Sequence, residues 1–235
     1  MTIKYIFDVD GTLTPSRGKI NEDFRLWFVD FCINNKVYLV TGSDYPKTVE
    51  QLGEYLCRWP VCIFNCSGND VWAKGKNICT NDWHMPVEVE KFLTQHLKDS
   101  KFVLRTGQHF DRRPGCVNFS ILGRGATLRE RQLYREWDIK TNERNLIVQQ
   151  FREIFSPDLE ISAGGETGVD IYPRGANKSQ IMKYFQVNDQ LMFFGDRMDQ
   201  FGNDRPLANE IAVAGGTNFH VTDWQETWKI LKKIS

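Results

Sequence analysis

Five short runs of β-branched and aromatic residues recur along the chain, and each is followed by polar residues or glycine. They lie at residues 3–9, 37–41, 61–65, 191–195 and 211–214. Segments with the apolar spacing of a helix separate several of them, near residues 21–34, 46–57, 177–186 and 223–233. Strands that alternate with helices are typical of a parallel sheet covered by helices. The pattern therefore predicts an α/β fold.

The pattern changes between about residues 82 and 174. The segment "HFDRRPGCVNFSILG" predicts a β-hairpin, because Pro114-Gly115 suits a type II turn and apolar residues alternate with polar ones after it. The segment "LEISAGGETGVDIYP" predicts a second hairpin, with Gly164-Gly165 as its turn. Helical segments near residues 86–98, 127–137 and 141–155 accompany these hairpins. We expect an α+β domain at residues 83–174, inserted into a core formed by residues 1–82 and 175–235.

Composition narrows the kind of partner. The 235 residues include 30 Lys and Arg against 30 Asp and Glu, so the formal net charge is zero, and no basic block stands out. Neither nucleic acid nor a membrane surface is therefore expected as a partner, and a small molecule is. The longest apolar runs fall far below the roughly 18 residues of a membrane span, and no secretory stretch begins the chain. We expect a cytoplasmic protein whose six cysteines are free thiols.

Oxygen-bearing side chains follow three of the predicted strands. Asp8 and Asp10 close the first strand, Thr41 and Ser43 the second, and Asp196 the fourth. In an open parallel sheet, functional groups gather where the carboxyl ends of strands meet the following loops. Carboxylates are hard ligands that suit Mg²⁺, which favours one or two of them together with water and phosphate. The sequence predicts a magnesium site built from Asp8, Asp10 and Asp196.

Two simpler interpretations of "DVDG" compete with this one. Asp and Gly are good turn formers, so an isolated D-x-D-G is more often a turn than a site. A calcium loop of the EF-hand type is excluded, because counting from Asp8 puts Leu13 at the glycine position and Lys19 at the bidentate glutamate position.

Chemistry can be assigned to these residues if the substrate carries a phosphate. Mg²⁺ beside Asp8 would reduce the repulsion between a carboxylate nucleophile and a phosphate dianion. Asp10 could exchange a proton with the leaving or attacking oxygen. Lys178, at the start of a predicted helix, could hold a phosphoryl oxygen, although a single lysine on a helix is usually just solvated.

Four motifs in order resemble the haloacid dehalogenase superfamily of phosphotransferases: "DVDGTLT", the "TGS" after the second strand, Lys178 and "GDRMDQFGND". The resemblance implies a Rossmann-like parallel-sheet core with an inserted cap. It implies that Asp8 is the nucleophile that forms an aspartyl-phosphate and that Asp10 is the acid/base. It also implies that Asp8, the Asp10 carbonyl and Asp196 bind Mg²⁺, with Asp204 supporting the metal loop.

The segments "DVDGTLTPSRGKI", "RRPGCVNFSILGR", "GGETGVDIYPRGANK" and "FFGDRMDQFGND" resemble the eukaryotic-type phosphomannomutases, nearly end to end. In that family the insertion is a mobile cap that closes over a hexose phosphate, and the resemblance suggests a homodimer through the cap. The resemblance implies substrate-binding roles for Arg17, Arg113, Arg124, Arg131 and Asp170. Three features depart from the family: Gly168 replaces a sugar-binding serine, Thr41 replaces the usual glycine and is more typical of phosphatases of the superfamily, and "DRMDQF" replaces the usual glycine-rich metal-loop sequence.

The chemistry of a mutase would explain why arginines are found in the inserted domain. A mutase must hold its sugar in both orientations, so the phosphate that is not reacting needs a cationic seat, and a guanidinium fork binds phosphate bidentately. Arg124 precedes a helix that Thr127 and Glu130 are expected to cap, and Arg131 falls in its first turn. Without the resemblance, the same arginines would be read as a solvated surface.

These observations predict a Mg²⁺-dependent phosphohexose mutase that interconverts mannose 6-phosphate and mannose 1-phosphate through phospho-Asp8, with a hexose 1,6-bisphosphate as activator and intermediate. In it, Lys178 and Ser43 steady the phosphoryl group. A sugar-phosphate phosphatase on the same scaffold, in which water attacks phospho-Asp8, is the alternative. A non-catalytic sugar-phosphate sensor is a third hypothesis, against which stands the presence of Asp8, Asp10 and Asp196.

Overall fold

The chain divides into two compact units. The computed structural model describes residues 2–164, 166–200 and 202–234. The core unit comprises Met1–Asn81 and Ala176–Ser235, and the inserted unit comprises Asp82–Gly175. The boundaries expected from the sequence lie one residue away from these on either side.

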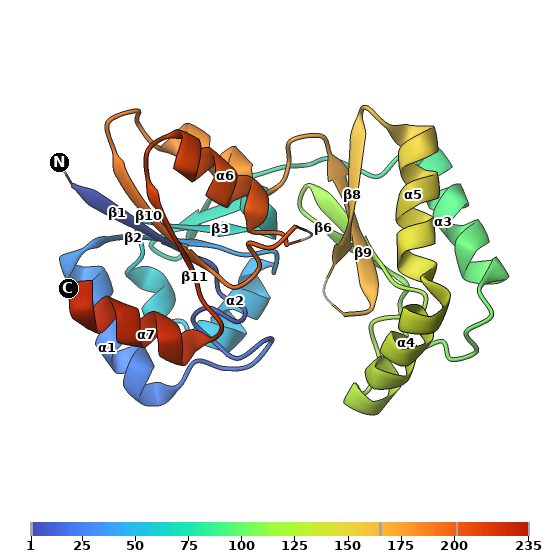
Figure 1. The fold of residues 1–235 in the computed structure, drawn as a ribbon, viewed down its shortest axis with the longest axis horizontal. Coiled ribbons are helices and arrows are strands. Elements are labelled where there is room, and N and C mark those ends of the chain that lie inside the picture. Colours follow the sequence, from blue (N-terminus) through green and yellow to red (C-terminus); the bar gives the residue numbers. More distant parts are fainter. Residues whose placement is uncertain (1, 165, 201, 235) are drawn as a thin grey trace. The chain divides into compact units, whose positions relative to one another are not determined.

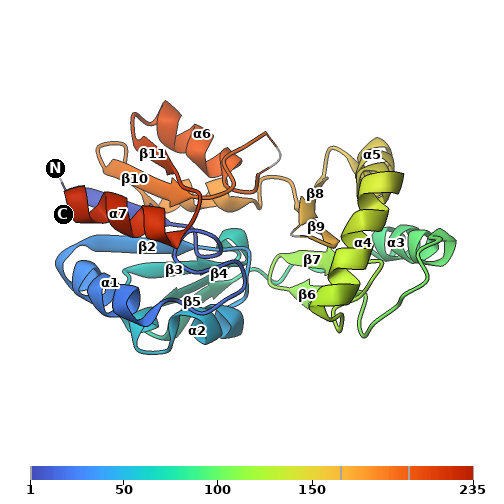
Figure 2. The same ribbon diagram turned by 60° about the horizontal axis from the view of Figure 1, so that its bottom comes forward.

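The core unit is built on a seven-stranded sheet with the order β11-β10-β1-β2-β3-β4-β5 (Figure 2). Its strands are β1 (Ile3–Phe7), β2 (Lys36–Val40), β3 (Cys62–Asn65), β4 (Asp70–Ala73), β5 (Lys76–Thr80), β10 (Gln190–Gly195) and β11 (Thr217–His220). The strands from β11 to β3 are parallel, whereas β4 and β5 add an antiparallel edge. The predicted α/β fold with a parallel sheet is confirmed.

Helices cover both faces of this sheet, which explains why its central strands are apolar throughout. Tyr5 and Phe7 on β1 join an apolar cluster with helices α1 (Glu22–Asn34), α2 (Tyr45–Leu52) and α7 (Trp224–Ile234). Ile6, between them, belongs to the opposite cluster, with α6 (Arg205–Val213) and the 3-10 helix η3 (Lys178–Tyr184). Successive strand residues point to opposite faces, so β1 is anchored from both sides. The residue that follows β1 is thereby held in a fixed position.

The predicted strand at residues 211–214 is wrong. Residues 211–213 form the end of α6, and the fifth parallel strand is β11, which follows it. Leu207 and Ile211, one helical turn apart, are fully buried, whereas Val213 is 85% exposed, so the apolar run continues a helical stripe. The helix ends before Gly215, whose φ of +79° favours glycine. The hairpin of β4 and β5 was not predicted, and the helix expected near residues 46–57 is α2 followed by the 3-10 turn η1 (Leu56–Arg58).

The inserted unit is an antiparallel sheet with helices on one side. Its strands are β6 (Phe110–Arg113), β7 (Cys116–Phe119), β9 (Gly168–Pro173) and β8 (Leu159–Gly164), in that spatial order. Figure 1 shows α3 (Val87–Asp99), α4 (Leu128–Thr141) and α5 (Glu143–Phe155) on one side of these strands. Val117, Phe119 and Ile171 point into the apolar cluster under the helices. The hairpin at Pro114-Gly115 is present, whereas Gly165 of the second predicted turn lies outside the described residues.

Polar residues occupy the opposite face of the inserted sheet. Asn118 on β7 pairs in register with Asp111 on β6 and with Asp170 on β9. These three residues therefore form a row across three strands on the side away from the helices. Among all the described residues, no helix is long and apolar enough to cross a membrane.

The two connections to the inserted unit are fastened at one residue of the core unit. Asn69, which is 3% exposed, accepts a bond at its carbonyl from the backbone N–H of Asn81 (2.7 Å) and one at its Oδ1 from the Asn81 side chain (2.9 Å). Its Nδ2 donates to the Ala176 carbonyl (3.1 Å) and to the Cys66 carbonyl (2.7 Å). Asn81 is the last core residue before the insertion and Ala176 the first after it. The Asn69 side chain thus holds together the two points at which the chain leaves the core unit and returns to it.

Replacing Asn69 with alanine should lower the free energy of unfolding by about 1–3 kcal/mol, because the buried Ala176 carbonyl and the half-buried side chain of Asn81 lose their hydrogen bonds to the Asn69 side chain. Denaturant titration measures this loss. Asn34→Ala is the matched control, since Asn34 is exposed and its side-chain amide donates to the Asp30 carbonyl of its own helix (2.9 Å). Equal effects of the two substitutions would contradict the role given to Asn69.

Candidate active site

A buried lysine joins two aspartates at the carboxyl ends of the central strands. Asp8 follows β1, and its N–H donates to the Phe194 carbonyl on β10 (2.9 Å). The Nζ of Lys178 lies 2.5 Å from Oδ1 of Asp8 and 2.7 Å from Oδ1 of Asp204. The side chains of these three residues are 5% exposed or less. Lys178 is therefore not a solvated lysine on a helix surface, which was the simpler interpretation of the sequence.

Local structure places the lysine and its second partner. Lys178 begins η3, and Asn177 caps this helix by accepting the Ser179 N–H at its Oδ1 (2.9 Å). Asp204 precedes α6, and its Oδ2 accepts the backbone N–H of Arg197 (3.0 Å). Both Asp204 oxygens thus have donors from the protein. Asp204 therefore holds both the lysine and the loop after β10. Its expected role in supporting a metal stays a prediction.

Asp196 completes an acidic cluster with Asp8 and Asp204. It follows β10, and one carboxylate oxygen from each of the three residues lies within 4.8 Å of the others. Gly11 makes room for it, since a Cβ at position 11 would lie 2.3 Å from Oδ2 of Asp196. Gly11 also has a φ of +78°, which favours glycine. The glycine of "DVDG" therefore has two structural reasons, the turn and the approach of Asp196.

The electrostatics of the cluster favour an added cation. Burial raises the pKa of Asp8 well above its ordinary value; Lys178 opposes this effect, and Asp204 and Asp196 add to it. Burial and then Asp204 raise the pKa of Asp196 to about 6. Burial would lower the pKa of Lys178, but the carboxylates of Asp204 and Asp8 outweigh it and raise the pKa.

Counting formal charges, three carboxylates against one ammonium leave two negative charges in a buried place. The donor atoms are all carboxylate oxygens, the ligands that hard divalent cations prefer. The charge and the donor set therefore fit a divalent metal ion.

Asp10 has a different environment from Asp8. Its Oδ1 accepts the Arg17 backbone N–H (2.6 Å) and the Gln51 side-chain amide (2.9 Å), and its Oδ2 accepts the Ser43 hydroxyl (3.4 Å). Its carboxylate is thus held by uncharged donors, outside the acidic cluster. Ser43 was predicted to steady a phosphoryl group, and in the structure its hydroxyl contacts Asp10.

Sequence reasoning missed Gln51. This residue is 1% exposed on α2, and besides Asp10 its amide donates to the Thr14 hydroxyl (3.2 Å) and the Gly18 carbonyl (3.3 Å). The backbone carbonyl of Gln51 accepts the Ile20 N–H (2.9 Å). Gln51 thereby ties the loop after β1 to α2. A polar residue in the buried stripe of a helix was the only available signal.

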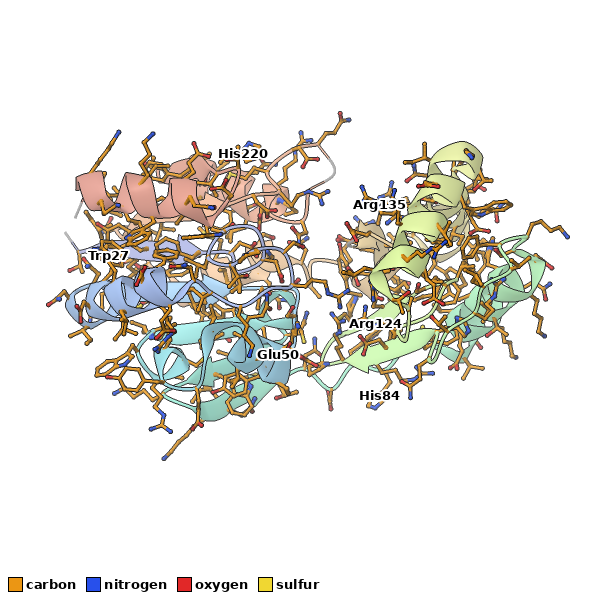
Figure 3. All side chains as sticks on the ribbon, turned by 90° about the horizontal axis from the view of Figure 1, so that it is seen from below. Trp27, Glu50, His84, Arg124, Arg135 and His220 are labelled. Atoms are coloured by element: carbon orange, nitrogen blue, oxygen red, sulfur yellow. The ribbon has the colours of Figure 1, made fainter. Side chains whose placement is uncertain are left out.

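The predicted substrate-binding residues fall in both units. Arg17 is in the core unit, with a left-handed φ of 57°, and the other four are in the inserted unit. Arg113 and Arg124 both contact Oδ2 of Asp111, at 2.6 and 3.0 Å. Arg124 is labelled in Figure 3. Burial would lower the pKa of Arg113, but Asp111 and then Asp170 raise it above the ordinary value.

Asn118 links this arginine pair to Asp170. Its Oδ1 lies 3.3 Å from Nη1 of Arg124, and its Nδ2 donates to Oδ1 of Asp170 (2.7 Å). Arg131 instead donates to the Ala126 carbonyl (3.4 Å), at the start of α4. The structure therefore brings Arg113, Arg124 and Asp170 into one network, through Asp111 and Asn118, which sequence reasoning did not single out. The capping box expected at Thr127 and Glu130 is confirmed.

Comparison with known proteins adds to this geometry. A family model described as eukaryotic phosphomannomutase matches residues 28–235. A phosphomannomutase of Galdieria sulphuraria is 30% identical, covering 97% of this chain and 93% of its own length, and one of Triticum aestivum is 29% identical, covering 97% and 94%. A solved haloacid dehalogenase-like hydrolase of Bacteroides thetaiotaomicron has a TM-score of 0.63 at 10% identity, with all of both chains covered. The last similarity shows the fold, which is that of the haloacid dehalogenase superfamily.

The acidic cluster predicts that Mg²⁺ stabilises the protein. At a concentration one hundred times its dissociation constant, the ion should add about 2.7 kcal/mol, seen as a rise in Tm by calorimetry. Asp196→Asn should abolish most of this rise because it removes one carboxylate from the cluster. Asp199→Asn, three residues along the same loop, removes an equal charge outside the cluster and should keep the rise. A rise that survives in the Asp196 variant would place the ion elsewhere.

Proposed function

The chain belongs to the eukaryotic phosphomannomutase family, and we propose that it interconverts mannose 6-phosphate and mannose 1-phosphate through a phospho-Asp8 enzyme. The observation that carries the proposal is the division between the two carboxylates after β1. Asp8 is paired with a buried lysine inside the acidic cluster, and Asp10 is held separately by uncharged donors. One carboxylate is thus suited to nucleophilic attack and the other to proton transfer.

The contacts of Asp8 indicate how the nucleophile is oriented. Its Oδ1 is held by Lys178, and its Oδ2 lies 3.5 Å from the Thr12 hydroxyl, too far for a strong hydrogen bond. We therefore assign the attack on phosphorus to Oδ2. Lys178 keeps the carboxylate in place and supplies positive charge beside the phosphoryl oxygens.

The reaction needs two phosphoryl transfers. In the first, a bond forms between Asp8 and the phosphorus at position 1 of a hexose 1,6-bisphosphate, the bond to the sugar oxygen breaks, and Asp10 gives that oxygen a proton, which releases the 6-phosphate. In the second, Asp10 takes the proton from the 6-hydroxyl of mannose 1-phosphate, the resulting oxygen attacks phospho-Asp8, and the bond between Asp8 and phosphorus breaks, which forms the bisphosphate again. Mg²⁺, held by Asp8, Asp196 and the Asp10 carbonyl, would neutralise charge between the carboxylate and the phosphate. The family implies a divalent metal, and the choice of Mg²⁺ and of the bisphosphate activator belongs to this proposal.

We assign a seat for the second phosphate to Arg113 and Arg124 of the inserted unit, which share one carboxylate partner, and to Arg131 of the same unit from the sequence prediction. The substrate-binding role of Arg17, in the core unit, stays a prediction. Asp170 is joined to Arg124 through Asn118, and we assign to it the acceptance of hydrogen bonds from sugar hydroxyls. A homodimer through the inserted unit and a cytoplasmic location stay predictions.

The environment of Gly168 favours the alternative function, that of a phosphatase. Gly168 stands where the family has a sugar-binding serine, and a Cβ there would lie 2.9 Å from both the Oδ1 and the Nδ2 of Asn118. The Asn118 amide thus fills the space of that side chain. A sugar bound with one contact fewer would leave phospho-Asp8 more open to water.

An assay of products separates the two reactions. The protein is incubated with mannose 1-phosphate, Mg²⁺ and a trace of hexose 1,6-bisphosphate, and both mannose 6-phosphate and free phosphate are followed. We expect mannose 6-phosphate to exceed free phosphate, because the arginine seat holds the bisphosphate for its second transfer. Free phosphate as the main product would replace the mutase assignment with the phosphatase one.

Substituting Asp8 with asparagine should lower turnover at least about a thousandfold, because the amide cannot form the acyl-phosphate. Steady-state kinetics and acid-stable labelling from a ³²P-bisphosphate both measure this. Asp30→Asn, an equal change of charge on the exposed side of α1, is the control and should keep both signals. Turnover that survives in the Asp8 variant would exclude Asp8 as the nucleophile.

A further inference from the structure

Asp111 is an acidic residue on the polar face of the inserted sheet, and the proposed function does not yet include it. Asp111 lies on β6, two residues before Arg113, so both side chains leave the strand on the same face. Arg112, between them, pairs instead with Glu90 of α3 (2.8 Å). Asp111 is thus directed to the arginines proposed to bind phosphate, while its neighbour is directed to the helices.

A single oxygen of Asp111 gathers both guanidinium groups. Oδ2 accepts from Nε and Nη2 of Arg113 (3.0 and 2.6 Å) and lies 3.0 Å from Nη2 of Arg124. The three side chains are 16–28% exposed, so water screens them less than it screens an ordinary surface ion pair. Two like charges repel at this separation, and the shared carboxylate offsets that repulsion. Arg113 and Arg124 are therefore held together before any ligand arrives.

The rest of the row keeps this arrangement in register. Asn118, which is 6% exposed, faces Asp111 across the β6–β7 pair and Asp170 across the β7–β9 pair. Its amide uses its oxygen for Arg124 and its nitrogen for Asp170, so it cannot rotate without losing both contacts. The side chains that hold Arg124 thus come from β6 and β7, and the row is tied to β9 as well.

We propose that Asp111 is a positioning residue that presets Arg113 and Arg124 as a bidentate seat for a sugar phosphate. This inference rests on the proposed function and deepens it. A guanidinium that is already oriented loses less rotamer freedom when it binds, so the benefit of Asp111 lies in substrate affinity. It should not lie in the chemical step, which belongs to residues of the core unit.

A carboxylate beside two guanidiniums could also act in the opposite way, by occupying the place of the phosphate. The contacts favour positioning, because Asp111 approaches Arg113 along the Nε edge and so engages two of the five N–H groups that a guanidinium has. The two roles predict opposite changes of KM when the carboxylate is neutralised, so kinetics can decide between them.

The test compares Asp111→Asn with the wild type and with Glu90→Gln. Both substitutions remove one carboxylate that forms an ion pair with an arginine of β6 or of the loop after β7. Glu90, however, pairs with Arg112 on the other face of the sheet. We expect Asp111→Asn to raise KM for mannose 1-phosphate about tenfold and to leave kcat within about twofold. The substitution removes charge-assisted hydrogen bonds to the arginines, and losing one such bond typically changes an affinity by about this factor. Asp111→Glu should recover part of the affinity, and Glu90→Gln should change neither constant.

A second measurement follows the arginines without substrate. In a ¹H–¹⁵N spectrum of the unliganded protein, the Nε–H of Arg113 should be protected from exchange in the wild type and in Glu90→Gln, and should lose this protection in Asp111→Asn. An unchanged or lower KM, or an unchanged Nε–H signal, would overturn the proposal. A wild type that converts no hexose phosphate would instead refute the proposed function, and the Nε–H signal would still show whether Asp111 orders the arginines.

Discussion

The active site of this protein depends on the burial of one ammonium group. Removing Lys178 from water costs several kcal/mol, which only well-placed opposite charges offset. Asp8 comes from the end of β1, Asp204 from the start of α6 and Lys178 from the start of η3, so the ion pairs join three segments that are distant in sequence. The backbone N–H of Arg197 adds the loop after β10 to this group. Correct folding of the core unit therefore also assembles the group formed by Asp8, Lys178 and Asp204.

Two carboxylates, separated in sequence by the single residue Val9, lie in contrasting surroundings. Asp8 shares a low-dielectric cluster with a cation and two more acids, whereas Asp10 accepts bonds from an amide, a hydroxyl and a peptide N–H. Pairs of like groups acquire separate roles when their environments separate their proton affinities or their reach. Here the separation arises because β1 ends at Phe7, so that Asp10 already belongs to the following loop, and because Gln51 holds that loop against α2.

Much of the core followed from the sequence, and the failures have physical causes. Strand ends in a parallel sheet meet at one edge, so the proximity of Asp8 and Asp196 was predictable once the strands were recognised. The run at residues 211–214 is four residues long and fits a helix or a strand equally well, and only its packing against the sheet decides. Gln51 could not be found because its role depends on a loop from another part of the chain. The position of Asp111 could be predicted in part from the sequence, since strand alternation places it on the same face as Arg113. The contact of Asn118 with Asp170 could not, because it requires knowing that β7 and β9 are neighbours.

The fastening of both chain crossings at Asn69 also bears on how such a protein can arise. Asn81 and Ala176 contact the same side chain, so the core closes on itself at that point whether a long segment or a short one lies between them. The entropy of loop closure grows only slowly with length, so a whole domain can be spliced in there with little thermodynamic penalty. The core unit can thereby exchange one inserted unit for another during evolution, while its strand order and its ion pairs are inherited intact.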